Sequence, residues 1–112
     1  MPCLYISTNV CLDGVDTNPL VAEATKACAS IIGKTENYIM VILKGSLDIT
    51  LAGNKEPAAY GEIVSVGGIN SQVKKRLIDS VASILQTNLS IPRTRFFLKV
   101  YDTTAGRVPS KL

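Results

Sequence analysis

Residues 38–43 read Tyr-Ile-Met-Val-Ile-Leu, the longest uninterrupted apolar run in the chain. Such a short, continuous run is typical of a strand that is covered on both faces, as in a parallel sheet. It is far shorter than the roughly 20 residues that a membrane-spanning helix needs, so we expect no membrane insertion. The elements predicted on either side of this run determine what can pack against the strand.

The residues before this run predict a strand and a helix. Residues 2–8 form the first strand candidate, and a helix is expected to begin at 16–19, where Asp-Thr-Asn precedes a proline. A capping side chain followed by proline in the first turn is a common helix start. Apolar residues then recur at helical spacing and end at a glycine: Leu20, Ala24, Cys28, Ile31 and Gly33. Strand, helix and strand together make a βαβ unit.

The residues after the run repeat this order. Residues 47–51 alternate apolar and polar side chains, which predicts a short strand, and 58–66 form a further strand candidate. Asn70 is positioned to cap a second helix, which ends at 90–92 and is followed by a strand at 94–101. The apolar stripe of this helix is Val73, Leu77, Val81, Ile84 and Leu85.

The two halves predict one α/β domain over residues 1–112 (α+β in some schemes), with a polar tail at 103–112. Right-handed crossovers would place both helices on one face of a single mixed sheet. The other face then needs a cover. Hydrophobic residues make up 46% of the chain and the mean hydropathy is +0.25, a surplus that favours burial between subunits.

Charge and composition exclude several classes of function. The net charge of +3 is spread along the chain, and the basic cluster Lys74-Lys75-Arg76 falls on the solvent side of a predicted helix, so we expect no nucleic acid partner. The chain has no histidine, which excludes Ser-His and Cys-His catalysis and most zinc sites. Its three cysteines lack CxxC spacing and are expected to be reduced. We expect neither a metal nor an organic cofactor.

The chain begins with Met1-Pro2, and an initiator methionine is usually trimmed before so small a residue. Trimming would leave Pro2 with a basic secondary amine, whereas an internal proline nitrogen is an amide. An apolar wall and a nearby cation would favour the neutral amine at pH 7, which could abstract a proton. If Met1 stays attached, this chemistry is lost.

A spaced set of short motifs runs through almost the whole chain: Ser7-Thr8-Asn9-Val10, Gly33-Lys34, Asn37-Tyr38-Ile39, Glu56-Pro57-Ala58, Ser65-Val66-Gly67 and Pro92-Arg93-Thr94-Arg95. Together with Pro2, this set resembles the macrophage migration inhibitory factor (MIF) and D-dopachrome tautomerase family, and is most similar to its plant MIF-like branch. The resemblance implies a homotrimer whose sheets line a central barrel. It also implies cofactor-free keto–enol tautomerisation of a small aromatic 2-oxo acid such as phenylpyruvate.

The same resemblance suggests roles for individual residues. Pro2 would be the catalytic base, and Lys34 would hold the substrate carboxylate or steady the enolate charge. Lys34 also suits the dipole at a helix C-terminus, so this second role stays open. Ser65 and Val66 match the strand end that lines the family's pocket, with ordinary strand-end packing as the alternative.

The chain departs from the animal cytokine in its expected pocket. A tyrosine that the neighbouring subunit supplies is replaced by Phe97, and an asparagine two residues later is replaced by Lys99. Strand alternation puts Phe97 and Lys99 on one face, so both changes would enter one site. The family's aromatic tail is also missing. The CxxC of the animal cytokine falls on 58–61, which contains no cysteine, so thiol-disulfide chemistry there is excluded.

The last three residues, Ser110, Lys111 and Leu112, form the peroxisomal targeting tripeptide. We therefore expect the peroxisome, the cytoplasm or both, with the peroxisomal import receptor as a partner; an ordinary polar tail is the alternative. Two functions stay open. Pro2 and Lys34 favour a weak phenylpyruvate tautomerase. The altered pocket favours a catalytically poor binding or signalling protein that engages MIF-type cell-surface receptors.

Overall fold

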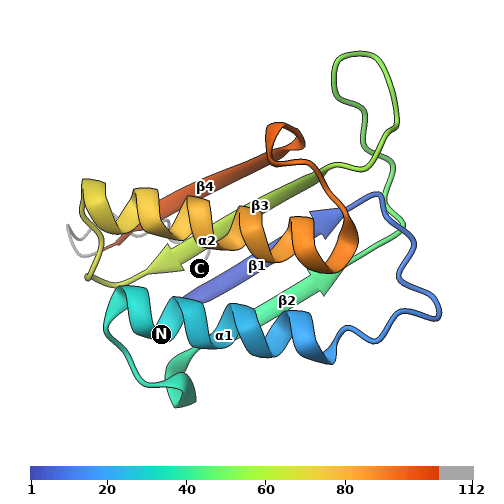
Figure 1. The fold of residues 1–112 in the computed structure, drawn as a ribbon. Coiled ribbons are helices and arrows are strands. Elements are labelled where there is room, and N and C mark those ends of the chain that lie inside the picture. The colour runs from blue at the N-terminus through green and yellow to red at the C-terminus, as the bar shows by residue number, and fades with distance from the viewer. Residues whose placement is uncertain (104–112) are drawn as a thin grey trace.

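The computed structural model describes residues 1–103, in which a four-stranded sheet packs against two long helices (Figure 1). The strands are β1 (Cys3–Thr8), β2 (Met40–Lys44), β3 (Ala59–Ser65) and β4 (Phe96–Asp102). The helices are α1 (Asn18–Ile32) and α2 (Ser71–Leu89). Two single-turn 3₁₀ helices, η1 (Glu36–Tyr38) and η2 (Arg93–Arg95), precede β2 and β4.

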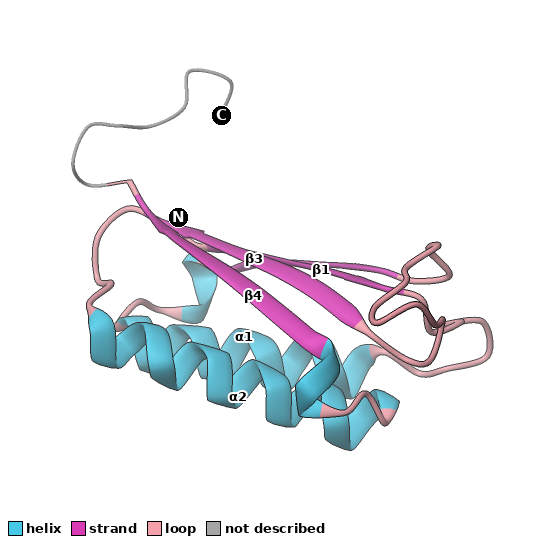
Figure 2. Cartoon of the chain, turned by 90° about the horizontal axis from the view of Figure 1, so that it is seen from above, coloured by secondary structure: helices cyan, strands magenta, loops and turns pink. Residues whose placement is uncertain are grey.

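The sheet is mixed and has the strand order β2-β1-β3-β4. β1 runs parallel to β2 and β3 runs parallel to β4, whereas the central pair β1 and β3 is antiparallel. Each parallel pair is joined by one helix, and both helices lie on the same face of the sheet (Figure 2). The prediction of two βαβ units in one mixed sheet is confirmed.

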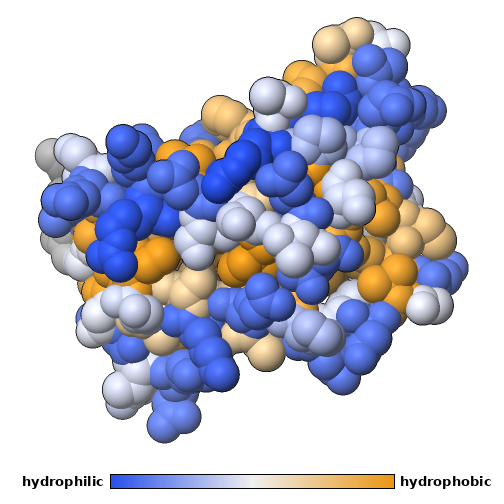
Figure 3. All heavy atoms as spheres, viewed as in Figure 1, coloured by the Kyte–Doolittle hydropathy of each residue, from blue (hydrophilic) through white to orange (hydrophobic). Residues whose placement is uncertain are grey.

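The core lies between the sheet and the helices. Successive strand residues point to opposite faces, so one set from each strand faces the helices. From β1, Leu4 and Ile6 are at most 1% exposed, and they pack with Ile63 of β3 and Leu98 of β4. The helices contribute Leu20, Ala24, Cys28, Leu77, Val81 and Leu85. Hydrophilic side chains cover much of the outer helix side, with hydrophobic ones between them (Figure 3).

Both helices begin and end near the predicted positions. Asn70 caps α2, because its Oδ1 accepts a hydrogen bond from the Val73 backbone N–H at 2.8 Å. At the start of α1, Asp16 Oδ1 accepts from the Asn18 backbone N–H at 3.0 Å. Gly33 ends α1 in the left-handed conformation with φ of 82°, which glycine adopts without strain.

The prediction of a strand at 47–51 is wrong for the single chain. In this segment the structure has only an isolated bridge between Leu51 and Asn54. A strand needs a partner, and this segment pairs with none of the four strands of the described sheet. Leu47 and Leu51 remain 36% and 43% exposed, so the alternating pattern has no apolar surface to cover within one chain.

The apolar run at 38–43 also differs from its prediction. Residues 36–38 form η1, and β2 begins only at Met40. β2 is covered on its helix side alone, because Met40 and Ile42 are 46% and 39% exposed on the opposite face. This open face of the sheet therefore leaves apolar side chains uncovered. No helix within residues 1–103 is long and apolar enough to cross a membrane.

Candidate functional site

Pro2 lies immediately before β1, at one end of the sheet. Its side chain is less than 2% exposed, and its carbonyl accepts a hydrogen bond from the Met40 N–H at 3.0 Å. Met1 is 69% exposed and its peptide bond makes the Pro2 nitrogen an amide. The ring of Pro2 is thus held in place, and the residue that would have to be removed to free its nitrogen is accessible.

The end of β3 lies beside the start of β1, because Cys3 pairs with Val64. Ser65 follows and is fully buried; its hydroxyl donates to the Gly67 carbonyl at 2.8 Å. Val66 is 55% exposed. The structure therefore brings Pro2 and the predicted strand-end residues Ser65 and Val66 to the same end of the sheet.

Lys34 lies at this same end, just after α1. Its backbone N–H donates to the Ala29 carbonyl at 3.0 Å, which fixes the backbone, while its side chain is exposed. No described carboxylate lies within ion-pair distance of its ammonium group. Lys34 can therefore meet an incoming anion, and its position at the helix C-terminus satisfies the alternative role as well.

Phe97 and Lys99 lie elsewhere in the chain. Phe97 is aligned through Tyr60 with Ser7, at the opposite end of β1 from Pro2. Strand rise and strand spacing place Phe97 roughly 19 Å and Lys99 roughly 14 Å from Pro2 within one chain. The two side chains share one face of β4, as predicted, and both are exposed there. Within one chain they are too far from Pro2 to touch it.

The open face carries a row of interacting polar and aromatic side chains. The rings of Tyr60 and Phe97 stack with centroids 5.8 Å apart, and the Tyr60 hydroxyl donates to Glu62 Oε2 at 2.8 Å. That hydrogen bond raises the pKa of Tyr60. Lys99 Nζ lies 5.2 Å from the centre of the Tyr101 ring, and its interactions with Tyr101 raise the pKa of Lys99. Lys99 is therefore a stable cation on this face.

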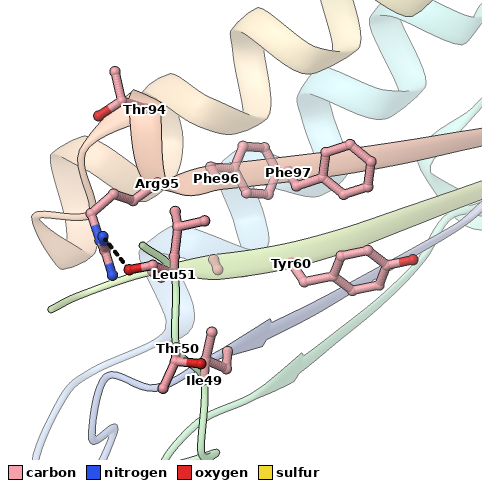
Figure 4. A pocket seen from close by; sticks show the side chains of 10 residues that line it. Ile49, Thr50, Leu51, Tyr60, Thr94, Arg95, Phe96 and Phe97 are labelled. Atoms are coloured by element: carbon pink, nitrogen blue, oxygen red, sulfur yellow. Dashed lines mark hydrogen bonds between the residues drawn. The ribbon is translucent and has the colours of Figure 1, made fainter. Parts of the chain in front are cut away.

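A hollow of about 330 Å³ lies at the far end of the sheet from Pro2, with Phe97 and Tyr60 in its wall (Figure 4). Its other lining residues are Ile49, Thr50, Leu51, Ala58, Ala59, Thr94, Arg95 and Phe96. The Arg95 guanidinium already donates to the backbone carbonyls of four loop residues, Leu51, Asn54, Glu56 and Pro57. The hollow is thus mainly an apolar contact surface, and the chemistry expected of Pro2 lies elsewhere.

Two motif residues, Asn9 and Arg95, have a structural role in the loop before β3. The Asn9 amide donates to the carbonyls of Lys55 and Glu56 at 3.1 and 3.0 Å, and its Oδ1 accepts from the Ala58 N–H at 2.9 Å. Arg95 donates to the carbonyls of Glu56 and Pro57 in the same loop. These two side chains therefore fix the path of the chain into β3.

The family model described as "Macrophage migration inhibitory factor (MIF)" matches residues 1–111. The chain belongs to the MIF family. A MIF from Xenopus laevis is 31% identical over 108 residues, covering 96% of this chain and 93% of that protein. A MIF homolog from Trichuris trichiura is 28% identical, covering 96% and 94%. Because these relatives are animal and parasite proteins, the plant branch stays a prediction.

Solved structures of MIF proteins have the same fold. The MIF homologue from Prochlorococcus marinus superposes with a TM-score of 0.82 at 28% identity, covering 89% of this chain and 87% of that one. The MIF from Trichinella spiralis gives a TM-score of 0.85 at 21% identity, covering 96% and 94%, which supports the fold alone. The predicted MIF-like fold is confirmed, within the tautomerase superfamily.

Sequence reasoning missed Tyr60 and Glu62. Both face the same way on a strand with alternating burial, but only the register with β4 places them opposite Phe97 and Lys99. Within residues 1–103 no cluster of three or more His, Cys, Asp or Glu side chains could hold a metal ion. The targeting tripeptide, Ser110 to Leu112, lies outside the described residues.

Proposed function

We propose that this MIF-family chain is a weak keto–enol tautomerase of aromatic 2-oxo acids, such as phenylpyruvate, that works as a homotrimer. The observation that carries the proposal is the convergence of Pro2, the Ser65-Val66 strand end and the Lys34 helix end at one end of the sheet. After removal of Met1, Pro2 would be the base that takes a proton from carbon 3 of the 2-oxo acid, and the 2-oxo oxygen gains a proton as the enol forms. Lys34 would hold the carboxylate.

The open face supports the trimer. Met40, Ile42, Phe97 and Tyr101 are all between 37% and 63% exposed on it. Leu47 and Leu51, in the segment after β2, are also exposed, at 36% and 43%. A monomer of this size rarely leaves so many large apolar side chains uncovered without a partner. The separation of Phe97 and Lys99 from Pro2 in one chain fits a site shared between two copies.

The alternative is a catalytically poor binding or signalling protein that engages MIF-type receptors. The exposed Lys99 favours it, because a second cation beside Pro2 would make the amine a weaker base. The plant branch and a peroxisomal or cytoplasmic location are further parts of the proposal. The motif set supports the plant branch, and the tripeptide Ser110-Lys111-Leu112 supports the peroxisomal location.

The test is the tautomerisation rate of phenylpyruvate with protein whose mass proves that Met1 is absent. We expect measurable turnover that Pro2→Gly abolishes while the trimer and its melting temperature persist. Equal turnover by both proteins would show that Pro2 is not the base. No turnover by processed wild-type trimer would favour the binding protein.

A further inference from the structure

Tyr60 is the aromatic neighbour of Phe97 on the open face. The two residues lie directly opposite each other in the β3–β4 register, and their rings stack at 5.8 Å with an angle of 27° between the planes. Phe97 itself is 63% exposed, so few contacts within the chain limit its ring. The orientation of Phe97 therefore depends strongly on Tyr60.

Tyr60 is in turn held by Glu62. Its hydroxyl donates to Glu62 Oε2 at 2.8 Å, and the two residues stand on the same side of β3 because they are two positions apart. Glu62 is half-buried between neighbours, with Tyr5 opposite it on β1 and Lys99 opposite it on β4. The Tyr60 ring stacks on Phe97 and its hydroxyl is hydrogen-bonded to Glu62, so the ring has little freedom to rotate.

We propose that Tyr60, anchored by Glu62, is a positioning residue that holds the Phe97 ring in the orientation in which it lines the pocket of a neighbouring copy. This inference rests on the proposed function. It makes Tyr60 a determinant of substrate class, because a fixed flat ring favours an aryl group through offset or edge-to-face packing. An aliphatic 2-oxo acid has no ring and gains nothing from a fixed Phe97.

The experiment compares phenylpyruvate with 2-oxohexanoate, an aliphatic acid with the same carboxylate and carbonyl groups. Dissociation constants are measured by ligand-observed NMR for the wild-type trimer and for Tyr60→Leu, Tyr60→Phe and Glu62→Gln. Tyr60→Phe keeps the ring and removes only the hydroxyl, so it is the matched control for Tyr60→Leu. Glu62→Gln keeps an oxygen that accepts the hydrogen bond. Sedimentation and melting temperature check each trimer.

We expect Tyr60→Leu to weaken the binding of phenylpyruvate at least about threefold relative to the binding of 2-oxohexanoate. This is the size of effect that the loss of an aromatic pair produces. Tyr60→Phe should lie between Tyr60→Leu and wild type, and Glu62→Gln should bind phenylpyruvate no more weakly than wild type. Equal losses for both acids, or no loss, would overturn the positioning role while the proposed function stands. A wild-type trimer that binds and converts neither acid would defeat the proposed function, and this inference with it.

Discussion

Gly68 lies so close to Ile32 that a side chain at this position would fit only if Ile32 moved slightly. An ideal Cβ on Gly68 would be 3.0 Å from Ile32 Cγ2 and 3.1 Å from the Ile32 carbonyl oxygen, and the φ of Gly68 is +80°. The loop after β3 therefore rests directly on the end of α1. This contact brings the Ser65-Val66 strand end and the Gly33-Lys34 helix end to the same place.

Gly68→Ala should be more destabilising than Gly14→Ala. Gly14 has a similar φ of +76° with nothing within 4 Å of an added Cβ, so it isolates the cost of the backbone conformation. That cost is about 1 kcal/mol for each variant. The contact with Ile32 should add at least about 1 kcal/mol for Gly68→Ala alone. Urea unfolding at one protein concentration measures the difference, and equal losses would show that the loop can move away from α1.

The pair Phe97 and Lys99 should limit turnover. The double variant Phe97→Tyr with Lys99→Asn restores the hydroxyl and the amide that the family resemblance implies, and removes a cation next to the expected base. One well-placed polar contact contributes about 1–3 kcal/mol, so kcat/KM for phenylpyruvate should rise at least about tenfold. A trimeric double variant with no gain would assign the limit to the missing aromatic tail instead.

Buried Cys28 should make stability depend on alkaline pH. Burial raises the pKa of Cys28 from its ordinary value of 9.0 to about 11. The folded chain keeps a proton that the unfolded chain loses between these values, so stability is fully present below about pH 9 and falls as pH rises, by about 2–3 kcal/mol in all. Urea unfolding against pH should show a flatter curve for Cys28→Ala. The exposed-cysteine variant Cys11→Ala should follow wild type, and a Cys28→Ala curve parallel to wild type would contradict the expectation.

The fold followed from local signals that act within one chain. The Asn70 cap, the Gly33 stop and the apolar stripes predicted both helices, and the strand candidates at 2–8 and 58–66 correspond to β1 and β3. The alternation at 47–51 does not predict the structure found there, because it indicates an apolar face but not whether the chain supplies a partner for it.

The candidate site could be predicted only in part. Pro2 and Lys34 were found through chemistry and resemblance, since neither spacing nor periodicity relates residues that distant in sequence. That Ser65 closes the strand end and that Tyr60 supports Phe97 needed the register of β3 with β1 and β4, which side-chain alternation does not fix between strands. Strand alternation assigns Phe97 and Lys99 to one face. Their distance from Pro2 follows only from the strand order and register of the folded structure.

The carboxyl-terminal tripeptide should direct the protein to peroxisomes. A fluorescent protein fused ahead of residue 1 leaves Leu112 free, as the import receptor requires for this type of signal. We expect punctate fluorescence that coincides with a peroxisomal marker, and cytosolic fluorescence once Ser110–Leu112 is deleted. Cytosolic fluorescence of the fusion protein with its intact tail would show that the tripeptide does not direct it to peroxisomes. The fusion blocks Pro2, so it reports location and not activity.

In the proposed trimer, each site takes Pro2 from one copy and Phe97 with Lys99 from another. The most direct measurement is phenylpyruvate turnover by a refolded equal mixture of Pro2→Gly and Phe97→Asp chains, with mixed trimers confirmed by native mass spectrometry. Each variant alone should be inactive, the first for lack of a base and the second because its carboxylate repels the substrate. Random assembly restores about a quarter of the sites, so the mixture should regain about a quarter of wild-type turnover. Confirmed mixed trimers that remain as inactive as their parents would contradict a shared site.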